Sequence, residues 1–125
     1  MPEWIFRDYL AANGTNDIRR WVSSLPKRAQ VKIDYIFLVL RGSRVWPEQY
    51  VSALKGWDDL YEIRIVADRV QYRPIGCYGP ARREFTLLIG AIEKGGKLPR
   101  GALEAATVRR KVILADRSRT CEHEF

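Results

Sequence analysis

The chain has few residues of the kinds that bind metals or form cross-links. Its 125 residues include two cysteines, Cys77 and Cys121, and a single histidine, His123. The cysteines are far apart and fit no metal-ligand spacing, so we expect neither a metal nor a cofactor. We expect both to be free thiols in a reducing compartment, although their number leaves a disulfide open.

Long hydrophobic segments are also missing. The most apolar run, residues 33–40, contains Asp34 and is too short to span a bilayer. The first ten residues lack the basic stretch and apolar core of a signal peptide. There is no internal repeat and no low-complexity segment. We therefore expect a cytoplasmic protein that does not enter a membrane.

Positive charge is plentiful. The 22 Lys and Arg residues outnumber the 15 Asp and Glu residues, which gives a formal net charge of +7. This balance favours a polyanionic partner, which could be nucleic acid, an acidic protein or an anionic membrane surface. The length fits one domain, and the 46% of hydrophobic residues are enough for a core.

Residues 60–66 alternate between apolar and polar side chains, which predicts a half-buried strand. Ile63 and Ile65 would point to the core, and Glu62 and Arg64 to the other face. A polar turn then leads into a second predicted strand over residues 70–78.

The predicted turn decides which cations meet. With a two-residue loop at Asp68-Arg69, Arg64 lies opposite Arg73, and two like charges so placed repel unless an anion lies over them. A three-residue turn would move Arg73 away. Lys55, in a Lys-Gly turn upstream, could reach the same face. The plainer interpretation of all three is a solvated surface.

The remaining pattern predicts an α+β fold with the order β-α-α-β-β-β-α. It is a small, mainly antiparallel sheet with an N-terminal helical hairpin packed on one face, a C-terminal helix, and a second face that is more exposed. Pro74 places its strand at an edge or at a bulge. The other elements are expected at residues 4–10, 15–25, 27–40, 84–92 and 100–115, with a frayed tail at 117–125.

Three phrases carry a resemblance to a known family: Leu54-Lys55-Gly56, Leu60-Tyr61-Glu62-Ile63-Arg64 and Tyr72-Arg73. The chain resembles the RelE/ParE toxin superfamily, most closely its phage-derived, HigB-like branch. The resemblance implies a single RelE-like domain over residues 1–125, acting as the toxin of a type II toxin–antitoxin module. Its partners would be a cognate antitoxin, of the helix-turn-helix type, and the ribosome with its mRNA.

Many such toxins cut mRNA on the ribosome by metal-free attack of a 2′-OH on the adjacent phosphate. This chemistry needs a base, cations for the developing charge and a proton for the leaving oxygen. The resemblance makes Lys55 the candidate base and Arg64 and Arg73 the phosphate ligands. The candidate RNA-binding residues are Trp57, Lys94, Lys97, Arg109 and Arg110.

The chain departs from the family at the end of its last strand. Where many relatives have histidine, an aromatic residue and lysine, it has Ile89, Ala91 and Glu93. Protonation of the leaving group would fall to Lys94, Lys97 or Tyr78, or be lost. Two alternatives therefore stay open: a ParE-type inhibitor of DNA gyrase without nuclease chemistry, and a decayed, non-catalytic basic binding module. His123, in the tail, is expected to be inert.

Overall fold

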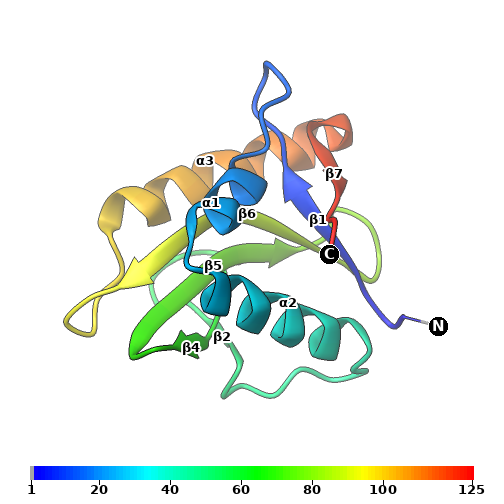
Figure 1. The fold of residues 1–125 in the computed structure, drawn as a ribbon. Helices are drawn as coiled ribbons and strands as arrows, with labels where there is room; N and C mark the ends of the chain where they lie inside the picture. The colour runs from blue at the N-terminus through cyan, green and yellow to red at the C-terminus, as the bar shows by residue number, and fades with distance from the viewer. Residues whose placement is uncertain (1) are drawn as a thin grey trace.

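A computed structural model describes residues 2–125 and shows a sheet covered by helices on both faces (Figure 1). This is the expected α+β class, with the helical hairpin on one face of the sheet. In chain order the elements are β1 (Ile5–Tyr9), α1 (Asp17–Ser24), α2 (Lys27–Arg41), β2 (Val51–Ala53), β3 (Tyr61–Ile63), β4 (Ile65–Ala67), β5 (Val70–Tyr78), β6 (Glu84–Glu93), α3 (Arg100–Ala115), η1 (Arg117–Arg119) and β7 (Thr120–Glu122).

The sheet has the strand order β2-β3-β5-β6-β1-β7, with β4 continuing beside β5 after β3 ends. Neighbouring strands are antiparallel except β1 and β6, which run parallel. The expectation that the apolar strand at residues 84–92 lies in the middle is confirmed, since β6 has β5 on one side and β1 on the other. Because β6 carries apolar side chains on both faces, other elements must cover both of them.

The turn between β4 and β5 has two residues, the shorter of the two lengths that the sequence left open. Ala67 pairs with Val70, and Asp68 and Arg69 both have positive φ, at 48° and 68°. Such a pair of left-handed residues matches the twist of the two strands. The register of this hairpin, carried to the next pair, places Arg64 opposite Arg73.

Pro74 interrupts this hairpin without lying at an edge. β5 is an internal strand, and its register on β6 shifts between Ile75 and Gly76. Pro74 was expected in an edge strand or at a bulge. The structure shows a bulge, which lies one residue after Pro74. The missing N–H of proline also explains why β3 and β4 are separated at Arg64, whose own amide donates to the Tyr50 carbonyl at 2.8 Å.

The two faces of the sheet carry separate cores. The first packs α1 and α2 against one face, with Ile33, Phe37, Ile63 and Phe85 among its fully buried residues. The second lies under α3. The expectation that the second face is more exposed is wrong, because the apolar positions of α3, including Ala106 and Ile113, cover it.

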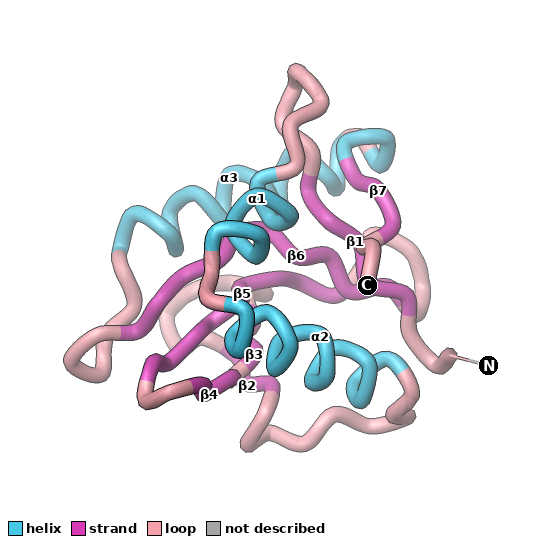
Figure 2. Tube along the Cα trace, viewed as in Figure 1, coloured by secondary structure: helices cyan, strands magenta, loops and turns pink. Residues whose placement is uncertain are grey.

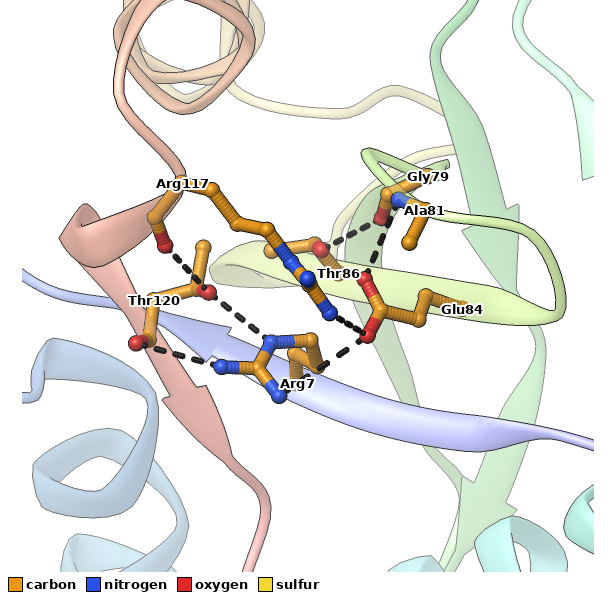
Figure 3. A network of polar contacts seen from close by, with 7 residues as sticks. All are labelled: Arg7, Gly79, Ala81, Glu84, Thr86, Arg117 and Thr120. Atoms are coloured by element: carbon orange, nitrogen blue, oxygen red, sulfur yellow. Dashed lines mark hydrogen bonds and ion pairs between the residues drawn. The ribbon is translucent and has the colours of Figure 1, made fainter.

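The expected frayed tail is wrong as well. β7 pairs with β1, and Figure 2 shows the two strands side by side. The buried carboxylate of Glu84 holds this end of the chain, since Arg7 and Arg117 both ion-pair with it (Figure 3). Arg7 Nε also donates to Thr120 Oγ1 at 2.8 Å. These contacts join β6, β1, η1 and β7. No periodic pattern in the sequence indicates them, because the residues are far apart in the chain.

His123 is buried against β1 at the end of this segment. Its Nδ1 lies 2.8 Å from Asp8 Oδ1, while Asn16 Nδ2 donates to Asp8 Oδ2 at 2.9 Å. The ring packs edge-on against Phe37 and Phe125. The only histidine of the chain is thus a structural tie between β7 and β1.

Both cysteines are free in the structure, and burial raises the pKa of the Cys77 thiol to about 11. None of the helices formed by residues 2–125 has the length and apolarity needed to cross a membrane.

We predict that His123→Ala lowers the free energy of unfolding by about 3 kcal/mol, because it leaves the buried Asp8 carboxylate without its main partner. Urea denaturation followed by tryptophan fluorescence measures the change. Glu124→Ala is the matched control, since its ion pair with Arg19 is exposed and contributes less than about 1 kcal/mol. Equal stabilities of the two variants would contradict the proposed tie.

Candidate functional site

A tight turn presents Lys55. Trp57 N donates to the Leu54 carbonyl at 3.1 Å, and Gly56 has φ of +85°. A glycine in this left-handed conformation at the third position is typical of a type II turn. The Lys-Gly sequence thus places the exposed Lys55 side chain at the tip of the turn.

The turn forms one wall of an open cleft of about 450 Å³. Strand β3, the end of β6, the loop after it and the beginning of α3 form the remaining walls. Positive side chains predominate, with two carboxylates among them; the charged and aromatic lining residues are Lys55, Trp57, Glu62, Arg64, Glu93, Lys97 and Arg100. Four of the eight candidate residues named from the sequence, Lys55, Arg64, Trp57 and Lys97, therefore meet here.

Arg73 lies on the same sheet face as Arg64, beneath this cleft, and only 6% of it is exposed. Its Nε is 3.6 Å from Glu62 Oε1 and 3.5 Å from Glu93 Oε1, too far for hydrogen bonds but close enough for ion pairs. One terminal nitrogen donates to Gln71 Oε1 at 2.8 Å. The single positive charge of Arg73 thus lies between two carboxylates.

These contacts correct the expected surface patch of three cations. Arg64 and Arg73 face each other, as a two-residue turn requires, but Glu62 lies between them and pairs with both. The anion that relieves their repulsion is therefore part of the chain. Glu62 lies two residues before Arg64 on one strand, so the sequence already placed it on the shared face.

The two terminal nitrogens of Arg64 are free to bind a ligand in the cleft. Only Nε is engaged, donating to Glu62 Oε2 at 3.1 Å, and 47% of the side chain is exposed. Within residues 2–125, its two terminal nitrogens have no hydrogen-bond partner. Their planar geometry suits two oxygens of one phosphate.

Trp57 combines a structural and an exposed surface. It packs at the border of the second core, and the guanidinium of Arg100 lies 5.6 Å from its ring centroid. Arg100 also pairs with the exposed Glu104, one turn along α3. Arg100 was not predicted as a site residue, although its position just after Pro99, at a helix start, places it on the same edge as Lys97.

The remaining candidates lie elsewhere. Arg109 donates to the Leu88 carbonyl and to Asp17, both within 3 Å, and so joins α3 to β6 and α1. Arg110 pairs with Asp59 at 3.0 Å, on another part of α3.

Lys94 and Tyr78 are also outside the cleft. Lys94 lines a neighbouring groove. Tyr78, at the other end of β5, packs with Trp4 and Trp46. Of the three residues considered for protonating a leaving group, only Lys97 lines the cleft.

The carboxylate of Glu93 brings a negative charge to the cleft wall. Among the described residues, no group of three or more His, Cys, Asp or Glu side chains is placed to hold a metal ion. The cleft therefore offers ammonium and guanidinium groups, two carboxylates and one aromatic face for contact with a ligand.

Comparison with known proteins gives one family. The family model described as phage-derived protein Gp49-like matches residues 20–111, about three quarters of the chain. The match includes all the cleft residues and excludes β1 and β7. No curated protein and no solved structure was found to match the chain.

We predict that Arg73→Met lowers the free energy of unfolding by about 3 kcal/mol or more, because it leaves Glu62 and Glu93 facing each other without their shared cation. Arg64→Met, the same change at the half-exposed partner, costs less than about 1 kcal/mol. Urea denaturation compares the two. Adding Glu62→Gln and Glu93→Gln to Arg73→Met restores part of the lost stability, because it removes the two carboxylates left without a cation. A triple variant no more stable than Arg73→Met would contradict the ion pairs of Arg73 with Glu62 and Glu93.

Proposed function

This chain belongs to the family of Gp49-like phage-derived proteins, a toxin–antitoxin-related family of RelE-like toxins, and on this premise we propose that it cuts messenger RNA on the ribosome. An antitoxin is the partner that the family implies. The proposed reaction is metal-independent cleavage of the RNA backbone, and it takes place in the cytoplasm, where the ribosomes are.

The observation that carries the proposal is the cleft itself. Four exposed cations, Lys55, Arg64, Lys97 and Arg100, line it together with Trp57, and Arg100 lies over the Trp57 ring. RNA backbones are held by such cations, while single-stranded bases stack on aromatic or guanidinium planes. The cleft is open and shallow enough for a strand to lie across it.

In the proposed reaction, Lys55 accepts a proton, Lys97 donates one and Arg64 binds the phosphate. The 2′-OH of one nucleotide attacks its own 3′-phosphate and loses its proton to Lys55, which must be neutral to accept it. The bond from phosphorus to the 5′-oxygen of the next nucleotide breaks, and Lys97 protonates that oxygen. The products are a 2′,3′-cyclic phosphate and a 5′-hydroxyl. Arg64 binds the two non-bridging oxygens, where negative charge develops in the transition state.

Arg73 acts through its neighbours in this scheme. Because it is buried under the cleft, it reaches no RNA directly, and we assign it a positioning role. Its ion pairs with Glu62 and Glu93 fix these carboxylates, and Glu62 in turn orients Arg64. Holding the guanidinium in place before the substrate binds lowers the cost of reaching the transition state.

One observation favours a second candidate, a ParE-type gyrase inhibitor. Glu93 places a carboxylate where many mRNA-cutting relatives have a lysine, and Ile89 stands in the place of their histidine. A binder of gyrase needs neither proton donor. The two functions predict different damage in cells, so one experiment separates them.

We predict that induced expression of the chain produces new mRNA 5′ ends within translated codons, mapped by primer extension. Lys55→Ala and Arg64→Ala each reduce cleavage by about 100-fold or more, the usual effect of losing a proton-transfer group or an anion ligand. Lys32→Ala, a matched loss of one exposed charge on α2, cleaves like the parent protein.

Intact mRNA accompanied by DNA damage would overturn the nuclease proposal in favour of the gyrase inhibitor. Normal growth, with neither, would support the decayed binding module. Full cleavage by Lys55→Ala would remove the assigned base while leaving the reaction in place.

A further inference from the structure

We propose that the second half of β6 is a docking edge, to which an extended, acidic segment of a partner protein adds as a new strand. The proposal rests on the proposed function in one respect, namely that the antitoxin is the protein that supplies this segment. The edge, the groove above it and its charge are properties of this chain alone.

The edge is open because β1 is shorter than β6. β1 pairs with the first half of β6 only, from Ile5 opposite Glu84 to Asp8 opposite Leu87. β6 continues to Glu93, paired on its other side with β5 as far as Gln71. In Figure 1 the yellow end of β6 runs on past β1. Over residues 89–93, no described strand lies on the β1 side.

A side chain marks the point where the strand pairing ends. Arg109 Nη1 donates to the Leu88 carbonyl at 2.8 Å, and its other terminal nitrogen is held by Asp17. A guanidinium thus takes the place of a neighbouring strand at Leu88. Beyond it, alternate residues of β6 turn their N–H and C=O groups to an edge with no strand beside it, the kind of edge that accepts another chain.

A groove of about 530 Å³ follows this open edge. Trp21 of α1 forms one wall, against the bare backbone of Gly90, where an added Cβ would meet the indole ring. The loop after β6 and the first turn of α3 form the other wall with apolar side chains; the lining residues there are Leu98, Pro99 and Ala102. Apolar walls around an unpaired backbone suit a peptide strand better than a nucleic acid.

The charge of the groove selects an acidic strand. Among the described residues that line it, the two charged ones are Lys94 and Lys97, both exposed and both at one end. Apolar residues at alternate positions would face the walls, and carboxylates at the end of the segment would reach the lysines. The net charge of +7 draws an acidic partner to the chain as a whole.

The groove also meets the cleft. Lys97 and Leu98 line both, so a segment in the groove ends beside Lys55 and Arg64. A carboxylate there would occupy Lys97 and narrow the approach of RNA. Strand addition at β6 thus gives the antitoxin a way to block the cleft without unfolding the toxin.

The test uses the full chain and three synthetic peptides, with no ribosome present. The first alternates Val and Thr over seven residues and has Glu at each end. The second has Lys in place of Glu. The third is the Glu peptide with alternate amides N-methylated, which removes the donors that pair with a strand edge. Calorimetry gives the affinities, and amide hydrogen exchange locates the contact.

We expect the Glu peptide to bind at least tenfold more tightly than either control and to protect amides of residues 89–93. The double variant Lys94→Glu/Lys97→Glu reverses the preference in favour of the Lys peptide. Ala102→Trp fills the groove and weakens binding at least tenfold. Val108→Trp, on an exposed face of the same helix, leaves the affinity unchanged.

Equal binding of the N-methylated peptide would overturn strand addition, as would protection confined to another part of the chain. A ten-nucleotide RNA that protects residues 89–93 more strongly than the Glu peptide would reassign the groove to nucleic acid. If the Glu peptide binds as expected while mRNA stays intact in cells, the docking edge stands and the nuclease proposal alone fails.

Discussion

The buried guanidinium of Arg73 pairs with two carboxylates and so determines which charged groups of the cleft remain free to bind a ligand. It lies between the carboxylates of Glu62 and Glu93 and so joins three adjacent strands, β3, β5 and β6, on one face. Without it, two acids would be left under a cleft whose proposed ligand is an anion. With it, one of these two negative charges is compensated inside the sheet, and Arg64, held by Glu62 with its outer nitrogens toward solvent, brings the second positive charge.

Helix α3 gives the same region its shape. Its apolar side covers the second core, and its first turn forms a wall of both the cleft and the groove. The unpaired end of β6 lies between the two, because β1 ends at Tyr9 and its pairing with β6 stops at Leu87. The short strand β1 thus pairs with the C-terminal tail on one side and leaves residues 89–93 of β6 without a neighbouring strand on the other.

Much of the fold could be predicted because its signals are local. The period of two in residues 60–66 and the doubly apolar strand at residues 84–92 each depend on adjacent residues, and both predictions are confirmed. The Asp68-Arg69 turn has the shorter of the two lengths that the sequence left open. The tail was mispredicted because Glu84, Arg7 and Arg117 come together only in the folded chain. The open edge was not predicted, since the length of β6 alone does not say where β1 leaves it.

For the site, the sequence by itself determined which residue types are present and that Glu62 and Arg64 share a face, because side chains two residues apart on a strand point the same way. Only the tertiary structure decided that Arg73 lies opposite Arg64, that Arg73 is buried and Arg64 half exposed, and that Lys97 and Arg100 complete the cleft. Burial depends on what packs over a strand face. The packing of α3 on β5 and β6, distant in sequence from the Lys55 turn, supplies that cover.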